Sequence, residues 1–83
     1  MSIQSKKFVV YTKPGCPYCQ KIKTIIDSKN GTYVEYVLDK DFTRDQFYSE
    51  FGESTTFPQV ICEDLKLGGC TEAVRYFRAM GWV

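Results

Sequence analysis

Residues 1–38 combine two kinds of hydrophobic pattern, and their order restricts the fold more than any other feature of the chain. Phe8-Val9-Val10-Tyr11 is an unbroken apolar, β-branched and aromatic run, which is typical of a strand covered on both faces. From Pro17, apolar residues recur at helical spacing until Asn30-Gly31, and residues 33–38 return to strand composition. A strand, a helix and a strand within so short a stretch predict a βαβ unit with parallel pairing.

The segment that follows carries the signals of a helix start. Thr43 and Gln46 match the two ends of a capping box. Phe42 and Phe47 flank the box at the spacing of a hydrophobic staple, which fixes the angle at which the chain enters a helix. We therefore expect a second helix that runs to about Phe51.

The C-terminal part predicts a hairpin and a third helix. Two short strands, 59–62 and 65–67, are joined by the polar pair Glu63-Asp64, which fits an antiparallel hairpin. After the turn at Gly68-Gly69, a helix begins at Cys70 and closes at Gly81. Helical spacing predicts four inward-facing side chains, namely Ala73, Val74, Phe77 and Met80. The same spacing turns two charged side chains outward, namely Arg75 and Arg78.

The element order is therefore βαβαββα, without a linker, a repeat or a low-complexity segment. We expect one α/β domain over residues 1–83, built on a four-stranded mixed sheet with helices on both faces. A length of 83 residues and a hydrophobic content of 43% suit a single compact unit of this kind.

Charge and hydropathy exclude several classes of function. The net charge is +1, and no basic run is longer than Lys6-Lys7, so the field needed for non-specific nucleic-acid binding is missing. No apolar run approaches the roughly 18 to 20 residues of a membrane span, and no signal-like apolar core follows the first residues. We expect a soluble, cytoplasmic protein that binds neither nucleic acid nor membrane.

The chain has no histidine but four cysteines, namely Cys16, Cys19, Cys62 and Cys70. Without histidine it lacks the imidazole base of most nucleophile pairs and the commonest metal ligand. A structural disulfide framework is one interpretation of four cysteines, but it suits secreted chains. A zinc site is another, but such sites usually show two close pairs, and seven residues separate Cys62 from Cys70.

The motif Cys16-Pro17-Tyr18-Cys19 stands where the first strand hands over to the first helix. Pro17 suits the first helical position because its missing N–H has no intrahelical partner there. The helix N-terminus favours the thiolate and should lower the pKa of Cys16 from about 8.5 toward about 3.5 to 7.5. Cys19 lies one turn further on the apolar face. We therefore expect Cys16 to be the nucleophile and Cys19 the resolving cysteine.

Two further positions flank this motif. Lys13 precedes the nucleophile by three residues, as a solvated surface charge or as a functional cation near the thiolate. Thr56-Phe57-Pro58 enters the third strand, where a proline indicates a tight turn with a cis bond or an ordinary loop. An extended residue before Pro58 offers its N–H and C=O to a bound peptide such as glutathione.

Four stretches of the chain together resemble one family. They are residues 13–19 with the Cys-Pro-Tyr-Cys centre, residues 56–59, Gly68-Gly69, and Cys70-Thr71-Glu72 at the start of the last helix. On these stretches the chain resembles the dithiol glutaredoxins of the thioredoxin-fold superfamily, over nearly the whole domain. Phe57 stands where valine is usual in the family, and Thr71-Glu72 where Ser-Asp or Asp-Asp is common.

The resemblance implies a thioredoxin-like fold and a glutathione site around the two cysteines. Lys13 and Arg44 would hold the glycine carboxylate of glutathione, and the backbone of Phe57 would pair with its cysteinyl residue. Thr71 and Glu72 would take the γ-glutamyl end. The full set of glutathione-binding residues implied in this way is Lys13, Tyr18, Arg44, Thr56, Phe57, Pro58, Gly69, Cys70, Thr71 and Glu72.

The same resemblance implies a glutathione-dependent thiol–disulfide oxidoreductase with Cys16 and Cys19 as catalytic residues. Glutathione would be its reductant and co-substrate, and no metal is expected. The implied partners are disulfide-containing or glutathionylated proteins, ribonucleotide reductase among them, and the protein is expected to be a monomer. Two other interpretations stay open: an iron–sulfur cluster shared between two subunits through Cys16 and glutathione, and a thioredoxin-fold binding module without catalysis.

Overall fold

A computed structural model describes residues 3–83 of the chain. Its elements are a 3₁₀ helix η1 (Ile3–Ser5), β1 (Lys7–Thr12), α1 (Pro17–Ser28), β2 (Thr32–Val37), α2 (Arg44–Phe51), β3 (Gln59–Cys62), β4 (Leu65–Gly68) and α3 (Cys70–Ala79). From β1 onward this is the predicted order βαβαββα. The short η1 at the start was not predicted.

The four strands form one mixed sheet in the order β2-β1-β3-β4. β1 pairs with β2 in parallel, which confirms the βαβ unit, and with β3 antiparallel. β3 and β4 form the antiparallel hairpin predicted around Glu63-Asp64. β1 is thus a central strand, and its C-terminal end carries the chain directly into the Cys-Pro-Tyr-Cys motif.

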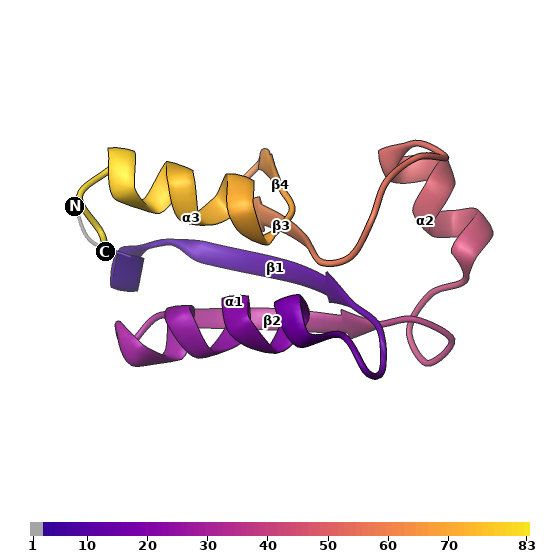
Figure 1. Cartoon of the computed structure of the whole chain (residues 1–83), viewed down its shortest axis with the longest axis horizontal. Coiled ribbons are helices and arrows are strands. Elements are labelled where there is room, and N and C mark those ends of the chain that lie inside the picture. The colour runs from indigo at the N-terminus through magenta and orange to yellow at the C-terminus, as the bar shows by residue number, and fades with distance from the viewer. Residues whose placement is uncertain (1–2) are drawn as a thin grey trace.

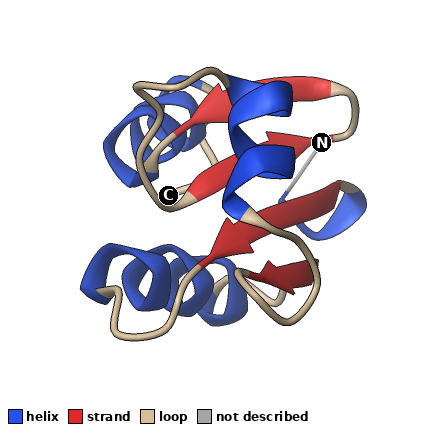
Figure 2. Cartoon of the chain, turned by 90° about the vertical axis from the view of Figure 1, so that its right-hand side faces the viewer, coloured by secondary structure: helices blue, strands red, loops and turns tan. Residues whose placement is uncertain are grey.

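One face of the sheet is covered by α1 and α3, as Figure 2 shows, where both helices lie on the left of the strands. The main core lies in this layer. Its centre is the edge-to-face pair of Phe8 and Phe77, whose ring centroids are 5.6 Å apart. Ile22 and Ile26 of α1 and Val10 of β1 are buried in the same cluster. This face therefore anchors the helix that carries both cysteines of the motif.

The other face of the sheet is covered only at one end. In Figure 1, α2 stands beyond the arrowhead of β1. The side chain of Tyr11 alternates away from the main core and contacts Phe47 and Phe51 of α2 at ring distances of 6.2 and 5.0 Å. Further from this cluster, Val34 is 52% exposed. The prediction of helices on both faces is confirmed. On this second face, α2 packs against the sheet through one aromatic cluster at the C-terminal end of β1.

The start of α2 follows the predicted capping pattern. The Thr43 side-chain oxygen accepts the Gln46 N–H at 3.2 Å, and the Gln46 side-chain oxygen accepts the Thr43 N–H at 2.8 Å. The rings of Phe42 and Phe47 stack at 5.7 Å, which confirms the staple. Both features are local in sequence, which is why the pattern alone predicted them.

One predicted core residue is wrong. Met80 follows the last residue of α3 and is 47% exposed, whereas Ala73 and Phe77 are fully buried. The chain turns at Gly81, where φ is +74°, and the Trp82 N–H reaches back to the Phe77 carbonyl at 2.8 Å. This turn puts the Trp82 ring, and not Met80, against the core.

None of the helices within residues 3–83 is both long and apolar enough to cross a membrane.

Candidate active site

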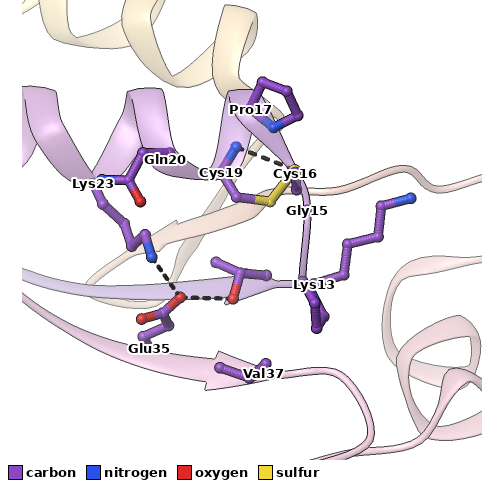
Figure 3. A pocket seen from close by; sticks show the side chains of 11 residues that line it. Lys13, Gly15, Cys16, Pro17, Cys19, Gln20, Lys23, Glu35 and Val37 are labelled. Carbon is purple, nitrogen blue, oxygen red and sulfur yellow. Dashed lines mark hydrogen bonds and ion pairs between the residues drawn. A yellow bond between two sulfur atoms is a disulfide. The ribbon is translucent and has the colours of Figure 1, made fainter.

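Cys16 is the N-cap of α1, and its backbone is extended, with φ −106° and ψ 103°. Its sulfur accepts a hydrogen bond from the Cys19 N–H at 3.2 Å. Pro17 occupies the start of the helix, as predicted. Cys16 and Cys19 form a disulfide, with their Cα atoms 5.2 Å apart, as Figure 3 shows. The strand-to-helix junction therefore holds both sulfurs at one helix end.

The two cysteines differ in their access to solvent. Cys16 is half-buried, whereas Cys19 is 2% exposed and shares the buried face of α1 with Ile22 and Ile26. A thiolate at Cys16 would keep the hydrogen bond from the Cys19 N–H and lie at the positive end of the helix dipole. The geometry supports attack from outside at Cys16 and resolution from inside at Cys19.

A polar cluster that the sequence did not predict lies behind the disulfide. Glu35 of β2 accepts hydrogen bonds from the Thr12 hydroxyl at 2.7 Å and from the Lys23 ammonium at 2.9 Å, drawn as dashed lines in Figure 3. These three residues line a cavity of about 490 Å³ together with Cys16 and Cys19. The sequence feature that could have indicated this polar cluster is a glutamate in the middle of a predicted strand.

The Glu35 carboxylate is expected to make stability depend on pH. Burial raises its pKa, but the hydrogen bonds from Lys23 and Thr12 and the charges of Lys23 and Lys40 outweigh burial, so the net pKa lies below the usual 4.5. A lowered folded-state pKa stabilises the fold above the unfolded value and loses this contribution as pH falls through the folded value. Glu35→Gln should therefore lower the unfolding free energy by about 1 kcal/mol at pH 7.

Urea unfolding of the two proteins at pH 7 and at pH 3 measures this effect. The difference between them should be smaller at pH 3, which lies below the ordinary pKa of a glutamate, because the stabilising contribution is lost as the pH falls. A difference that is equal at both pH values would show that the charge of Glu35 contributes nothing to folding.

On the other side of the motif lies a groove of about 300 Å³ at the cis Phe57–Pro58 bond. All eight residues that line it belong to the predicted glutathione set, namely Tyr18, Thr56, Phe57, Pro58, Gly69, Cys70, Thr71 and Glu72. One Glu72 carboxylate oxygen accepts the Gly69 N–H at 2.9 Å, so its other oxygen is the one left for a ligand. The structure thus gathers segments from α1, the loop before β3 and the start of α3.

The two predicted cations of the site are placed differently. The Lys13 ammonium lies 5.8 Å from the centroid of the Phe57 ring, at the border between the groove and the cavity behind the disulfide. Arg44 is the exposed first residue of α2 and does not line the groove. Arg44 precedes Phe47 by three residues on α2, and Phe47 stacks on Phe57 at 4.2 Å, so this aromatic packing sets where α2 stands relative to the groove.

The remaining cysteines are both buried and outside the disulfide. Burial raises the pKa of the Cys62 thiol, with a smaller contribution from Glu63, and raises that of Cys70, with a smaller one from Glu72. No group of three or more histidine, cysteine or acidic side chains within residues 3–83 could hold a metal ion.

Selective alkylation should separate these thiols. In the reduced protein, iodoacetamide at pH 6 is expected to modify Cys16 first, because it combines access with stabilisation of the thiolate. Cys62 and Cys70 should stay unmodified until the protein unfolds. Peptide mapping by mass spectrometry after a short exposure checks this order, and modification of Cys70 as fast as Cys16 would contradict it.

A dithiol at the start of the first helix, next to a cis-proline groove on a mixed four-stranded sheet, defines a protein of the thioredoxin-like class. The sequence model of the glutaredoxin family matches residues 8–65. The chain belongs to the glutaredoxin family.

Named relatives agree with this assignment. Glutaredoxin 1 of Rickettsia conorii is 37% identical over 65 residues, which cover 75% of this chain and 63% of that protein. Glutaredoxin 3 of Escherichia coli is 30% identical over 63 residues, 76% of each chain. The alignment thus spans under two thirds of the length of the Rickettsia relative.

Solved structures show the same fold. The crystal structure of glutaredoxin 1 from Francisella tularensis complexed with cacodylate superposes with a TM-score of 0.78 at 30% identity and covers 92% of this chain and 96% of that one. A buckwheat glutaredoxin–glutathione complex superposes with a TM-score of 0.76 at 24% identity and covers 94% and 74%.

Proposed function

We propose that this protein is a glutathione-dependent thiol–disulfide oxidoreductase that acts through Cys16 and Cys19. The observation that carries the proposal is the placement of Cys16. It is half-buried, it caps α1, and its sulfur receives the N–H of a second, buried cysteine. This arrangement favours a thiolate that a substrate can reach, with a resolving thiol one turn away.

On a glutathionylated protein, the Cys16 thiolate attacks the sulfur of the glutathionyl group. The substrate disulfide breaks, the client leaves as a thiolate, and glutathione is bound to Cys16 as a mixed disulfide. The thiolate of a second glutathione then attacks this mixed disulfide, which releases glutathione disulfide and restores Cys16. This route needs one sulfur of the protein.

On a protein disulfide, both cysteines take part. Attack by Cys16 joins the protein to its client through one sulfur and releases the other client sulfur as a thiolate. Cys19 loses its proton and attacks Cys16, which frees the reduced client and leaves the Cys16–Cys19 disulfide. Two glutathione molecules reduce that disulfide and leave as glutathione disulfide. The structure presents the protein in this oxidised form.

The groove at Pro58 is the proposed binding site for glutathione. Neither the N–H nor the C=O of Phe57 forms a backbone hydrogen bond in the described chain, so both are available to pair with an extended ligand. The Lys13 ammonium over the Phe57 ring supplies a cation for a carboxylate. The buckwheat relative, which shares this fold, is a glutathione complex. We propose no contact for Arg44 in the oxidised state described.

We further propose a monomeric, single-domain, cytoplasmic protein whose partners are glutathione and proteins with a disulfide or a bound glutathionyl group. Ribonucleotide reductase is a candidate client.

The proposal is tested by coupling the protein to glutathione, NADPH and glutathione reductase, with glutathionylated cysteine as the substrate. We expect NADPH oxidation that is proportional to protein concentration and needs glutathione. A correctly folded protein, as judged by circular dichroism, that gives no rate above the uncatalysed reaction would overturn it.

A further inference from the structure

A basic cavity of about 270 Å³ lies between α1 and α3, beside the proposed glutathione groove. The two helices pack on the same face of the sheet, as Figure 2 shows. Lys21 of α1 and Arg75 and Arg78 of α3 line the cavity. It shares Tyr18, Cys70 and Thr71 with the groove, so the two hollows form one continuous surface.

The cavity itself is lined by three cations, and the acidic side chain of the continuous surface, Glu72, lines the groove and not the cavity. No acidic side chain lines it, and the ion pairs found within residues 3–83 join Lys23 to Glu35 and Lys66 to Glu50. The whole chain carries a net charge of only +1, so three cations in one hollow do not reflect a general excess of basic residues. Arg75 and Arg78 are three residues apart on α3 and repel each other on one helix face. An anionic ligand bound between the two arginines would offset this repulsion.

The walls of the cavity suggest what kind of anion fits. The three cations come from two helices and stand beside the half-buried Val74 and the exposed Tyr18 ring. A segment of polypeptide can present several carboxylates to these cations and apolar side chains to the rest of the cavity wall. A single inorganic anion would meet only part of it.

We propose that this cavity binds an acidic stretch of the client protein while the client's disulfide or glutathionyl sulfur meets Cys16. The inference rests on the proposed function and adds the charge of the preferred client to it. The cavity is continuous with the groove, so a client held at Cys16 brings its neighbouring residues close to the cavity. This proximity gives those residues a high effective concentration at the three cations. Charged contacts at such a rim act mainly on the rate of capture and weaken with salt.

The kinetic test uses two glutathionylated peptides that differ only in an acidic stretch beside the cysteine, with Asp and Glu in one and Asn and Gln in the other. For the wild type we expect about a tenfold higher kcat/KM for the acidic peptide at low ionic strength, falling toward parity as salt rises. Glutathionylated cysteine, which carries no acidic stretch beside its disulfide, serves as the reference substrate.

The variants locate the effect. Arg75→Gln combined with Arg78→Gln should remove most of the preference and leave turnover of glutathionylated cysteine unchanged. Lys7→Gln combined with Lys29→Gln removes the same charge from two exposed positions, the first residue of β1 and the residue after α1, and should keep the preference. A preference that survives in the Arg75 and Arg78 variant, or that is lost equally in the control, would overturn the inference.

A binding measurement separates this inference from the proposed function. An acidic peptide without a thiol, titrated into the oxidised protein, should shift the backbone amide NMR signals around Arg75, Arg78 and Lys21 and should do so less in the double variant. Absence of turnover with glutathionylated cysteine would contradict the proposed function, whereas absence of these shifts would contradict the acidic docking site. Equal shifts from inorganic phosphate at matched ionic strength would reduce the cavity to a general anion site and also overturn the inference.

Discussion

Cys16→Ser is expected to reduce both glutathione-dependent activities to the uncatalysed background, whereas Cys19→Ser should keep most deglutathionylation and lose most reduction of protein disulfides. The reason is the geometry of the pair. Cys16 is the sulfur that a substrate can reach, and Cys19 is 2% exposed on the core side of α1. Removal of a mixed glutathione disulfide needs only the first sulfur, whereas release of a protein disulfide needs the second.

Coupled assays with a glutathionylated peptide and with a disulfide-bonded protein measure the two activities side by side. Cys62→Ser is the matched control, because Cys62 is a buried cysteine in β3 that lines neither the groove nor the cavity behind the disulfide. It should keep both activities per folded molecule. If Cys16→Ser and Cys19→Ser lose deglutathionylation equally, the assignment of nucleophile and resolving thiol is wrong.

Phe77→Ala is expected to cost about 3 to 5 kcal/mol of unfolding free energy, and Met80→Ala less than about 0.5 kcal/mol. Phe77 is fully buried and contacts Phe8 and Trp82 at ring distances of 5.6 and 5.8 Å, so its removal leaves a cavity. Met80 is nearly half exposed beyond the end of α3. The first loss is comparable with the whole stability of a domain of this size, about 4 to 12 kcal/mol.

Urea denaturation followed by circular dichroism gives both values. Circular dichroism is preferable to fluorescence because Trp82, the single tryptophan, contacts Phe77 and would report the substitution itself. A loss at Met80 as large as that at Phe77 would contradict the turn at Gly81 that directs Trp82 into the core.

The parts of the fold that the sequence predicted depend on local chemistry. Apolar runs and strand composition predicted the four strands, and helical spacing predicted α1 and α3. The Thr43 and Gln46 pair predicted α2 and its cap, and Pro17 predicted the first residue of α1. The cis bond before Pro58 was also among the expected features. Each of these signals acts within a few residues, so the sequence displays them without knowledge of the tertiary structure.

The parts that were missed depend on contacts between distant segments. The hydrogen bond between Glu35 and Thr12 joins residues 23 positions apart, and only the register of β1 against β2 brings them together. Arg44 is an exposed residue that does not line the groove, and its place depends on how α2 packs through Phe47 against Phe57. Met80 was assigned to the core because its position in the sequence continues the helical spacing of Ala73 and Phe77. The helix itself ends at Ala79, so this spacing no longer applies to Met80.

The most direct test of the glutathione-dependent mechanism uses the Cys19→Ser variant, which can form a mixed disulfide at Cys16 but cannot resolve it. The reduced variant is mixed with glutathione disulfide, quenched with acid and mapped by mass spectrometry. The proposed mechanism predicts one glutathionyl group per chain, located on Cys16, and its removal by added glutathione. A glutathionyl group found on Cys70 or Cys62 instead, or no adduct on the folded variant, would contradict it.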